Sequence, residues 1–175
     1  FVFISTSSVK RKYQTFYSRT KKAAEEILLA YMEKYNAPIC IIRPFSITGV
    51  SEQPEHLIPT LIKSGMNDIE MPFVVDARHD FIDVDDVVSG ILTLSKRRAR
   101  GIFELGTGKS WSNLEIKLLV EKAIGKTIKT HNVTNMRVYD SGEWVSTNFM
   151  ARNYGWESKK TLGDSIKEMV ENYDK

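Results

Sequence analysis

The sequence has little of what marks secreted, membrane-spanning or nucleic-acid-binding proteins. Its one cysteine, Cys40, cannot form an internal disulfide, and its place in the apolar run 38–42 predicts a small buried side chain and no oxidising compartment. No apolar run approaches the roughly 20 residues that cross a bilayer, and the opening residues lack the charged flank of a signal peptide. The formal charge is only +3, and the densest basic cluster, at 96–100, is typical of a helix C-terminus. We therefore predict a cytoplasmic protein that binds neither a membrane nor nucleic acid.

Two patterns that suggest ligand sites lack the spacing those sites require. A phosphate-binding P-loop needs a glycine five positions before Gly108, where the sequence has Phe103. Acidic residues and a histidine gather between positions 76 and 86, but a metal ion needs convergent ligands, and an alternating strand would place Asp80 and Asp83 on different sides. The members of this cluster are Asp76, His79, Asp80, Asp83, Asp85 and Asp86. We predict that no metal is bound.

Strand-like and helix-like segments alternate along the chain, which favours an α/β fold with parallel strands. Apolar runs predict strands at 1–4, 38–42, 71–75, 80–84 and 102–105, the first two of them buried. Helical periodicity predicts helices at 15–35, 56–62, 87–95, 112–124 and 161–173. Asp85 or Asp86 is expected to cap the third helix. A capping box formed by Ser112 and Glu115 is expected to open the fourth, which Gly125 ends.

The helix expected at 15–35 carries Tyr17 and Lys21 four positions apart, so both side chains lie on one face. The apolar stripe of this helix is expected to comprise Tyr17, Lys21, Ala24, Leu28, Tyr31 and Tyr35. A phenol is a poor acid or base at neutral pH, but a cation about 4 Å away stabilises a phenolate by roughly 4 kcal/mol at an effective dielectric constant of about 20. Such a pair can exchange a proton with a substrate hydroxyl. The same spacing also occurs where a lysine extends from an amphipathic helix beside a core tyrosine.

The order of several motifs resembles that of the extended short-chain dehydrogenases/reductases, also called the NAD-dependent epimerase/dehydratase family. This family places Ser or Thr at a strand end, Tyr-x-x-x-Lys on the next helix, and Arg-Pro-Phe at the end of the following strand. The matching segments are ISTSSV at 4–9, YSRTK at 17–21, IRPFSITG at 42–49, HDFIDVDDV at 79–87 and GIFELGTG at 101–108. YGW at 154–156 and LGDS at 162–165 extend the resemblance to near the end of the sequence.

The resemblance implies the C-terminal part of a Rossmann-like doubly wound parallel sheet, together with a small substrate-binding α/β lobe. Residues 1–50 would belong to the dinucleotide-binding domain, and residues 51–175 would mainly form the lobe, with 76–105 returning to the main sheet. The Gly-x-Gly-x-x-Gly fingerprint and its acidic partner are absent from the sequence. The first residue is not Met, and only eleven positions separate Thr6 from Tyr17, fewer than the family usually has. We therefore expect a partial chain.

The resemblance also implies a chemistry. Tyr17 would be the acid/base, Lys21 would hold the nicotinamide ribose and favour the ionised phenol, and Thr6 would donate a hydrogen bond to the reacting sugar oxygen. NAD or NADP would contact Tyr17, Lys21 and Pro44. The expected function is that of a nucleotide-sugar epimerase or reductase, with a homodimer formed through the Tyr17 helix. The nucleotide sugar itself is expected to contact Ser7, Ser46, His56, Leu57, Arg78 and His79.

Several positions depart from the family pattern. Ser7 and Ser8 stand where family dehydratases have an Asp-Glu pair, which disfavours 4,6-dehydration because a serine hydroxyl is too weak an acid for that step. The other departures are Lys10-Arg11 for Tyr-Gly, Thr48 for Tyr, His79 for a phosphate-binding Arg, and Glu104 for Asn. They leave two alternatives to the enzyme: a non-catalytic family member that acts as a binding or scaffold protein, and an incomplete fragment without independent function.

Overall fold

A three-stranded parallel sheet lies at the centre of the computed structural model, which describes residues 1–75, 77–134 and 144–173. Its strands are, in spatial order, β1 (Val2–Ile4), β2 (Cys40–Pro44) and β7 (Gly101–Leu105). Cys40 lies opposite Val2 on one side and opposite Gly101 on the other, so the central strand is β2. This sheet confirms the predicted α/β architecture with parallel strands.

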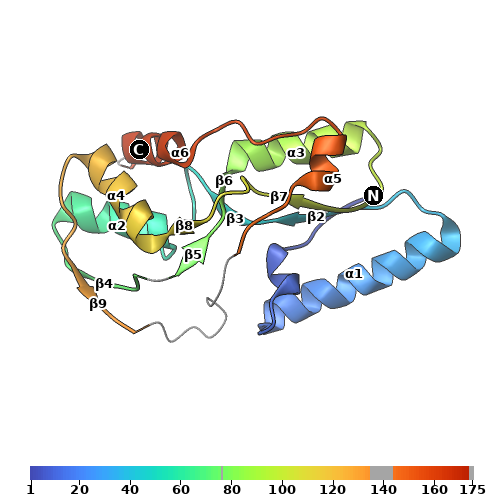
Figure 1. Ribbon diagram of the computed structural model, residues 1–175, viewed down its shortest axis with the longest axis horizontal. Coiled ribbons are helices and arrows are strands. Elements are labelled where there is room, and N and C mark those ends of the chain that lie inside the picture. The colour runs from blue at the N-terminus through green and yellow to red at the C-terminus, as the bar shows by residue number, and fades with distance from the viewer. Residues whose placement is uncertain (76, 135–143, 174–175) are drawn as a thin grey trace.

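Helices cover both faces of this sheet (Figure 1). Helix α1 (Phe16–Tyr35) lies on one face, and α3 (Val84–Lys96) and α5 (Phe149–Asn153) lie on the other. The core under α1 contains Met32, Ile39 and Ile41, and the core under α3 and α5 contains Ile42, Leu94, Phe103, Ala151 and Trp156. Strand β2 contributes Cys40 and Ile42 to one of these cores and Ile41 to the other, as expected for a strand covered on both faces.

A second group of elements forms a lobe beside the sheet, at the left of Figure 1. Its helices are α2 (Leu57–Asn67), α4 (Asn113–Ile124) and α6 (Leu162–Glu171). Its short strands are β4 (Met71–Phe73) paired with β9 (Thr130–Asn132), and β5 (Arg78–His79) paired with β8 (Trp111–Ser112). These elements share one core that includes Ile58, Leu61, Phe73, Ile116 and Ile166. The division of the chain at residue 50 into two domains stays a prediction.

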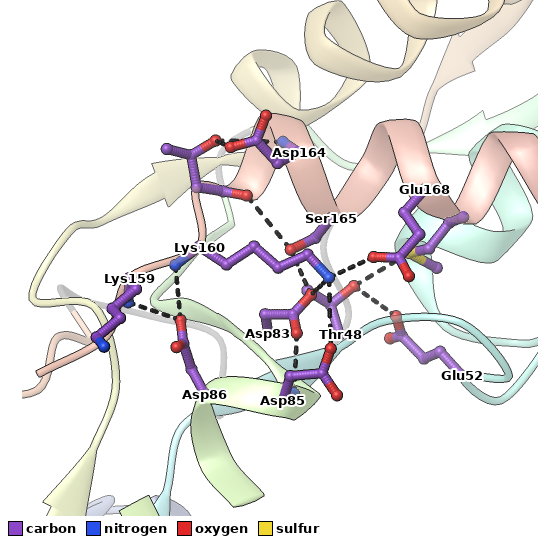
Figure 2. Close-up of polar contacts among 12 residues, drawn as sticks. Thr48, Glu52, Asp83, Asp85, Asp86, Lys159, Lys160, Asp164, Ser165 and Glu168 are labelled. Atoms are coloured by element: carbon purple, nitrogen blue, oxygen red, sulfur yellow. Dashed lines mark hydrogen bonds and ion pairs between the residues drawn. The ribbon is translucent and has the colours of Figure 1, made fainter. Parts of the chain in front are cut away.

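A buried polar network joins helix α6 to the strands that lead out of the main sheet (Figure 2). Strand β3 (Ser46–Thr48) pairs with β6 (Phe81–Asp83), and Asp83 is 2% exposed. The Asp83 carboxylate accepts hydrogen bonds from Ser165 Oγ at 2.6 Å and from the backbone N–H of Asp85 at 2.9 Å, and it pairs with Lys160 Nζ at 3.0 Å. A buried carboxylate is stable only with such partners, so the network fixes α6 against β6.

Local sequence signals predicted several elements correctly. Helix α1 begins after Thr15, whose hydroxyl caps Ser18 N. The capping box of Ser112 and Glu115 opens α4, and Gly125 ends it in the left-handed conformation at φ 70°. Cys40 is buried as predicted, and burial raises the pKa of its thiol to about 11. None of the described helices is both long and apolar enough to cross a bilayer.

Two predictions about helices were wrong. Helix α3 begins at Val84, three residues earlier than predicted, because Asp83 rather than Asp85 or Asp86 is its N-cap. The predicted apolar stripe of α1 is also wrong, because Tyr17 and the two tyrosines of its last turns are more than half exposed. The residues of α1 that are buried are Ser18, Glu25 and Met32. The sequence pattern misled because Glu25, a charged residue, lies on the buried face.

The predicted strand at 1–4 is an edge strand with a partly exposed surface, and its predicted burial was wrong. Phe1 is 71% exposed and Ile4 is 39% exposed, because β1 pairs with β2 alone among the described strands. Several short elements carried no sequence signal that we recognised. They are the 3-10 helix η1 (Ser7–Lys10), strands β3, β5, β8 and β9, and helix α5.

Candidate active site

A cavity of about 320 Å³ lies beyond the C-terminal ends of β1 and β2. Doubly wound sheets bind their ligands in the crevice at this edge. The cavity is lined by Thr6, Ser7, Ser8, Arg11, Tyr13, Thr15, Ser18, Phe45, Ser46, His79 and Trp144. Hydroxyl groups dominate, joined by one guanidinium and one imidazole, and no carboxylate is among these lining residues. The cavity therefore suits a polar ligand rich in hydrogen-bond acceptors.

The loop after β1 supplies the hydroxyl groups of one wall. Thr6 caps η1, and its Oγ1 accepts a hydrogen bond from Ser8 N at 3.3 Å and lies 3.1 Å from Ser8 Oγ. Ser7 is 5% exposed, and its Oγ accepts a hydrogen bond from Trp144 Nε1 at 3.1 Å. Because Ser7 Oγ already accepts from the indole, its own proton is available to an acceptor in the cavity.

Tyr17 and Lys21 lie at the start of α1, beside this loop but outside the lining of the cavity. Lys21 Nζ donates a hydrogen bond to the Ile4 carbonyl at 2.8 Å. The same ammonium lies 5.9 Å from the centroid of the Tyr17 ring and 5.0 Å from that of Phe3. Tyr17 is 55% exposed. The two side chains are thus neighbours, as the four-residue spacing predicts, and Lys21 connects α1 to the end of β1.

An ion pair between Glu25 and Arg43 holds α1 against the sheet. Glu25 is 1% exposed and accepts two hydrogen bonds from Arg43, one of them from Nε at 2.9 Å and the other from Nη2. Arg43 lies in β2, directly before Pro44, which is buried but does not line the cavity. The pair fixes how far Tyr17 and Lys21 lie from the ends of the strands.

The other residues predicted to contact a substrate divide into two groups. Ser7, Ser46 and His79 line the cavity together with Thr6. Leu57 lies at the start of α2, His56 precedes it at the N-cap position without a side-chain capping hydrogen bond, and neither lines the cavity. Arg78 also lies outside it, because its guanidinium donates to Ser110 Oγ and O, both at 3.0 Å, and to Glu115 at 3.4 Å.

Sequence reasoning missed several lining residues, chiefly Arg11, Tyr13 and Trp144. The Trp144 ring lies 4.6 Å from the Arg11 guanidinium carbon and 5.6 Å from the Phe45 ring centroid. Ser7 and Trp144 are 137 residues apart in the sequence, so no local pattern could have brought them together. Phe45 lies inside the Arg-Pro-Phe motif and could have been inferred from it.

Comparison with known proteins identifies the family. Residues 3–106 match the sequence model of the NAD dependent epimerase/dehydratase family. The chain belongs to this family. The match covers the strand end with Thr6, the Tyr-x-x-x-Lys helix and the Arg-Pro-Phe strand, and it includes every lining residue of the cavity except Trp144.

The similar proteins carry the names of enzymes for different nucleotide sugars. UDP-glucuronate 4-epimerase from Thermodesulfobacterium geofontis is 25% identical over an alignment of 157 positions that covers 88% of this chain and 49% of that protein. CDP-abequose synthase from Salmonella muenchen is 28% identical over an alignment of 182 positions, gaps included, that covers 96% of this chain and 61% of that protein. The crystal structure of dTDP-glucose 4,6-dehydratase from Bacillus anthracis in complex with NAD has a TM-score of 0.88 at 23% identity, over 99% of this chain and 61% of that one. The chain thus spans about half the length of the first relatives it matches.

The glycine-rich turn after β7 binds an internal carboxylate. Asp80, which is fully buried, accepts hydrogen bonds from Thr107 N at 2.8 Å, Gly108 N at 3.0 Å and Ser146 Oγ at 2.7 Å. The N–H groups that a P-loop would offer to phosphate are therefore used within the protein. In the described part of the chain no three His, Cys, Asp or Glu side chains are grouped so that they could hold a metal ion. Asp76, part of the acidic cluster in the sequence, lies outside the described residues.

Proposed function

We propose that the chain carries the proton-transfer and sugar-binding part of an NAD(P)-dependent enzyme that epimerises or reduces nucleotide sugars. Thr6 donates a hydrogen bond to the reacting sugar oxygen, and Tyr17 takes the proton from that oxygen or returns it. Lys21 keeps a positive charge beside the Tyr17 phenol and binds the nicotinamide ribose. Lys21 and Pro44 would hold the nicotinamide end of NAD or NADP, which would supply the hydride acceptor or donor for the sugar carbon.

The observation that carries this proposal is the hydrogen bond from Lys21 Nζ to the Ile4 carbonyl. It brings the start of α1 to the end of the strand that leads into Thr6, so Tyr17 and Lys21 lie beside the loop whose Thr6 lines the cavity. The side chains fit the nicotinamide end of NAD(P), because Lys21 and the buried Pro44 both lie at the C-terminal edge of the sheet. The sequence holds no Gly-x-Gly-x-x-Gly to bind the pyrophosphate, so the proposal requires that a dinucleotide-binding segment outside these 175 residues supplies this contact.

The proposed substrate contacts follow the two groups of residues described above. Ser7, Ser46 and His79 bind the sugar hydroxyls within the cavity. His56, Leu57 and Arg78 lie outside it, so we assign them to the nucleotide and its phosphates. His79 stands where relatives have a phosphate-binding arginine, and Arg78 next to it supplies the positive charge.

We rank 4,6-dehydration below epimerisation and reduction, on chemical grounds alone. Water elimination needs an acid and a base, and Ser7 and Ser8 stand at the positions where family dehydratases carry them. A 4,6-dehydratase is among the similar structures, so the comparisons do not support this ranking. The products of the reaction decide between the three activities.

The decisive experiment incubates the natural full-length protein and its Tyr17→Phe variant with NAD or NADP and UDP-glucose, UDP-glucuronate or dTDP-glucose. We expect a C4 epimer or a reduced sugar by NMR, and a loss of about 100- to 10,000-fold in kcat for the variant, because proton transfer is lost. Tyr35→Phe, a matched loss of one exposed phenol at the other end of α1, should keep full activity. Equal turnover by Tyr17→Phe and the natural protein would contradict the proposal, and a 6-deoxy-4-keto product would reverse our ranking.

A non-catalytic binding protein is the second candidate, favoured by the exposure of Tyr17 and its place outside the cavity lining. Binding of these nucleotide sugars in calorimetry, without turnover in the presence of either cofactor, would establish that function instead.

We also propose that the protein forms a homodimer through α1. Phe16 is 84% exposed, Ile27 is 70% exposed and Tyr31 is 53% exposed, which is much apolar surface for one helix. A dimer mass in light scattering of the natural protein would support this assembly, and a monomer at all concentrations would exclude it.

A further inference from the structure

Two of the positions that depart from the family pattern contact each other across the fold. Lys10 follows the loop of Thr6, Glu104 lies in β7, and the two are 94 residues apart in the sequence. Lys10 Nζ forms an ion pair with Glu104 Oε1. The Glu104 side chain is only 13% exposed, and that of Lys10 is 43% exposed. An asparagine at position 104 would have no charge to attract this ammonium, so the ion pair depends on both departures.

The second carboxylate oxygen of Glu104 binds another segment. Glu104 Oε2 accepts hydrogen bonds from Thr147 N at 3.1 Å and from Thr147 Oγ1 at 3.2 Å. Burial acts to raise the pKa of Glu104, but hydrogen bonds from Lys10 and Thr147 outweigh it and hold the pKa below its ordinary value. Glu104 therefore stays ionised and connects two segments that are distant in the sequence, the loop 6–11 and the segment 144–148.

These two segments both line the cavity and contact each other. The loop contributes Ser7, Ser8 and Arg11, and the segment contributes Trp144, whose indole donates to Ser7 Oγ. The Trp144 ring also lies against the Arg11 guanidinium. Trp144 is three residues from Thr147, so the position of its ring depends on how the segment is held at Glu104.

We propose that Glu104 is a positioning residue, which holds loop 6–11 and segment 144–148 together and so fixes the Trp144 wall against which the sugar of the substrate fits. The ligand part of this inference rests on the proposed function, whereas the structural part does not. An isolated surface ion pair would contribute little, but this carboxylate is largely buried and receives hydrogen bonds or charge from three donors. Glu104 touches neither the reacting atoms nor the cavity, so its effect is transmitted through Trp144.

The first test needs no ligand and follows the Trp144 indole N–H in ¹H–¹⁵N spectra of the natural full-length protein. Trp144→Phe assigns the signal. We expect Lys10→Met and Glu104→Ala to shift it, and Lys10→Arg, which keeps the charge, to leave it at its natural position. Asp68→Asn is the matched control, because it breaks another Lys–carboxylate pair, Lys129 Nζ to Asp68 Oδ2 at 2.7 Å, between exposed residues. An unmoved Trp144 signal in Lys10→Met and Glu104→Ala would overturn the proposal.

The second test measures affinity by calorimetry, with UDP-glucose and dTDP-glucose as probes and UDP and dTDP as controls. We expect Lys10→Met to weaken binding of the nucleotide sugars about fivefold and to leave binding of the free diphosphates within about twofold. Equal losses for sugar and diphosphate would overturn the role in sugar fit. If the natural protein binds none of the four probes, the proposed function fails, while the indole signal still decides whether Glu104 positions Trp144.

Discussion

The network around Lys160 and the Tyr17–Lys21 end of α1 use polar residues in opposite ways. In the network, Asp83 receives two hydrogen bonds and an ion pair while 2% exposed, and Lys160 contacts Glu168 as well as Asp83 (Figure 2). The hydrogen bond to Glu168 is the main reason why the pKa of Lys160 is well above its ordinary value, with Asp83 adding to it. Tyr17, in contrast, is more than half exposed.

This difference separates residues that hold the fold from residues that remain available to a ligand. A buried carboxylate without partners costs several kcal/mol, so Asp83 and its partners must all be present for α6 to pack. A residue that exchanges protons with a substrate has to keep its polar atom accessible, and it contributes little to stability. Substitutions in the network around Lys160 should therefore lower the stability of the protein, whereas substitutions at Tyr17 or Lys21 should lower its activity.

Asp83→Ala should give the largest loss of stability. It removes the N-cap of α3 and leaves Ser165 Oγ and Lys160 without their buried acceptor, so we expect the free energy of unfolding to fall by about 3 kcal/mol. Urea denaturation of the natural protein and the variant measures this. Asp85→Ala is the control, because its carboxylate is 80% exposed and lies 3.7 Å from Lys160, and it should cost less than about 0.5 kcal/mol. Equal effects of the two would contradict a structural role for the network.

Glu25→Gln should combine both kinds of response. The neutral amide of the variant would offer the Arg43 guanidinium one acceptor oxygen and no negative charge. We expect the free energy of unfolding to fall by about 2 kcal/mol. Because the pair places α1 on the sheet, kcat should also fall, with KM for the nucleotide sugar less affected. Glu26→Gln, an exposed neighbour on the same helix, should change neither quantity. A variant that is destabilised but keeps its full kcat would show that the pair has no part in positioning Tyr17.

The sequence predicted those features that depend on local patterns. Thr6, Ser46 and His79, expected at the site from the family resemblance, line one cavity because the first two follow strands whose C-terminal ends lie at one edge, while their contacts to a substrate stay a prediction. The capping box of α4 was equally predictable, since it needs only residues three apart.

The features that could not be predicted depend on tertiary pairing. Glu25 can be buried on α1 because Arg43 of β2 pairs with it. The face of α1 that carries Glu25 therefore packs on the sheet, and the tyrosines that we expected to be buried are exposed. Trp144 lines the cavity because it contacts Ser7 and Phe45, and both of these residues are far from it in the sequence. The partner of a charged helix residue cannot be found from local sequence, because it lies on another element. A hydrophobicity pattern therefore predicts that such a residue is exposed to solvent.

Glu52→Gln tests the smallest difference, that between a saturated and a partly satisfied buried carboxylate. Glu52 is 7% exposed and has hydrogen bonds with Thr48 Oγ1 at 2.7 Å and His56 Nδ1 at 3.0 Å, yet burial outweighs them and raises its pKa above the ordinary value of 4.5. The folded protein therefore binds the proton more tightly than the unfolded chain does. Stability should fall as the pH rises from about 4.5 through the raised pKa, and stay lower at neutral pH.

In the Gln variant this decline disappears, because the amide does not ionise. We expect the variant to be about 0.5 kcal/mol more stable than the natural protein at pH 7 and to lose that advantage at pH 4. Urea denaturation at both values measures the difference. Glu55→Gln changes the same charge at an exposed position of the same loop and should show no such gain. A Glu52→Gln variant that is less stable at pH 7 would mean that the hydrogen bonds from Thr48 and His56 outweigh burial, which would place Glu52 with Asp83 among the saturated carboxylates.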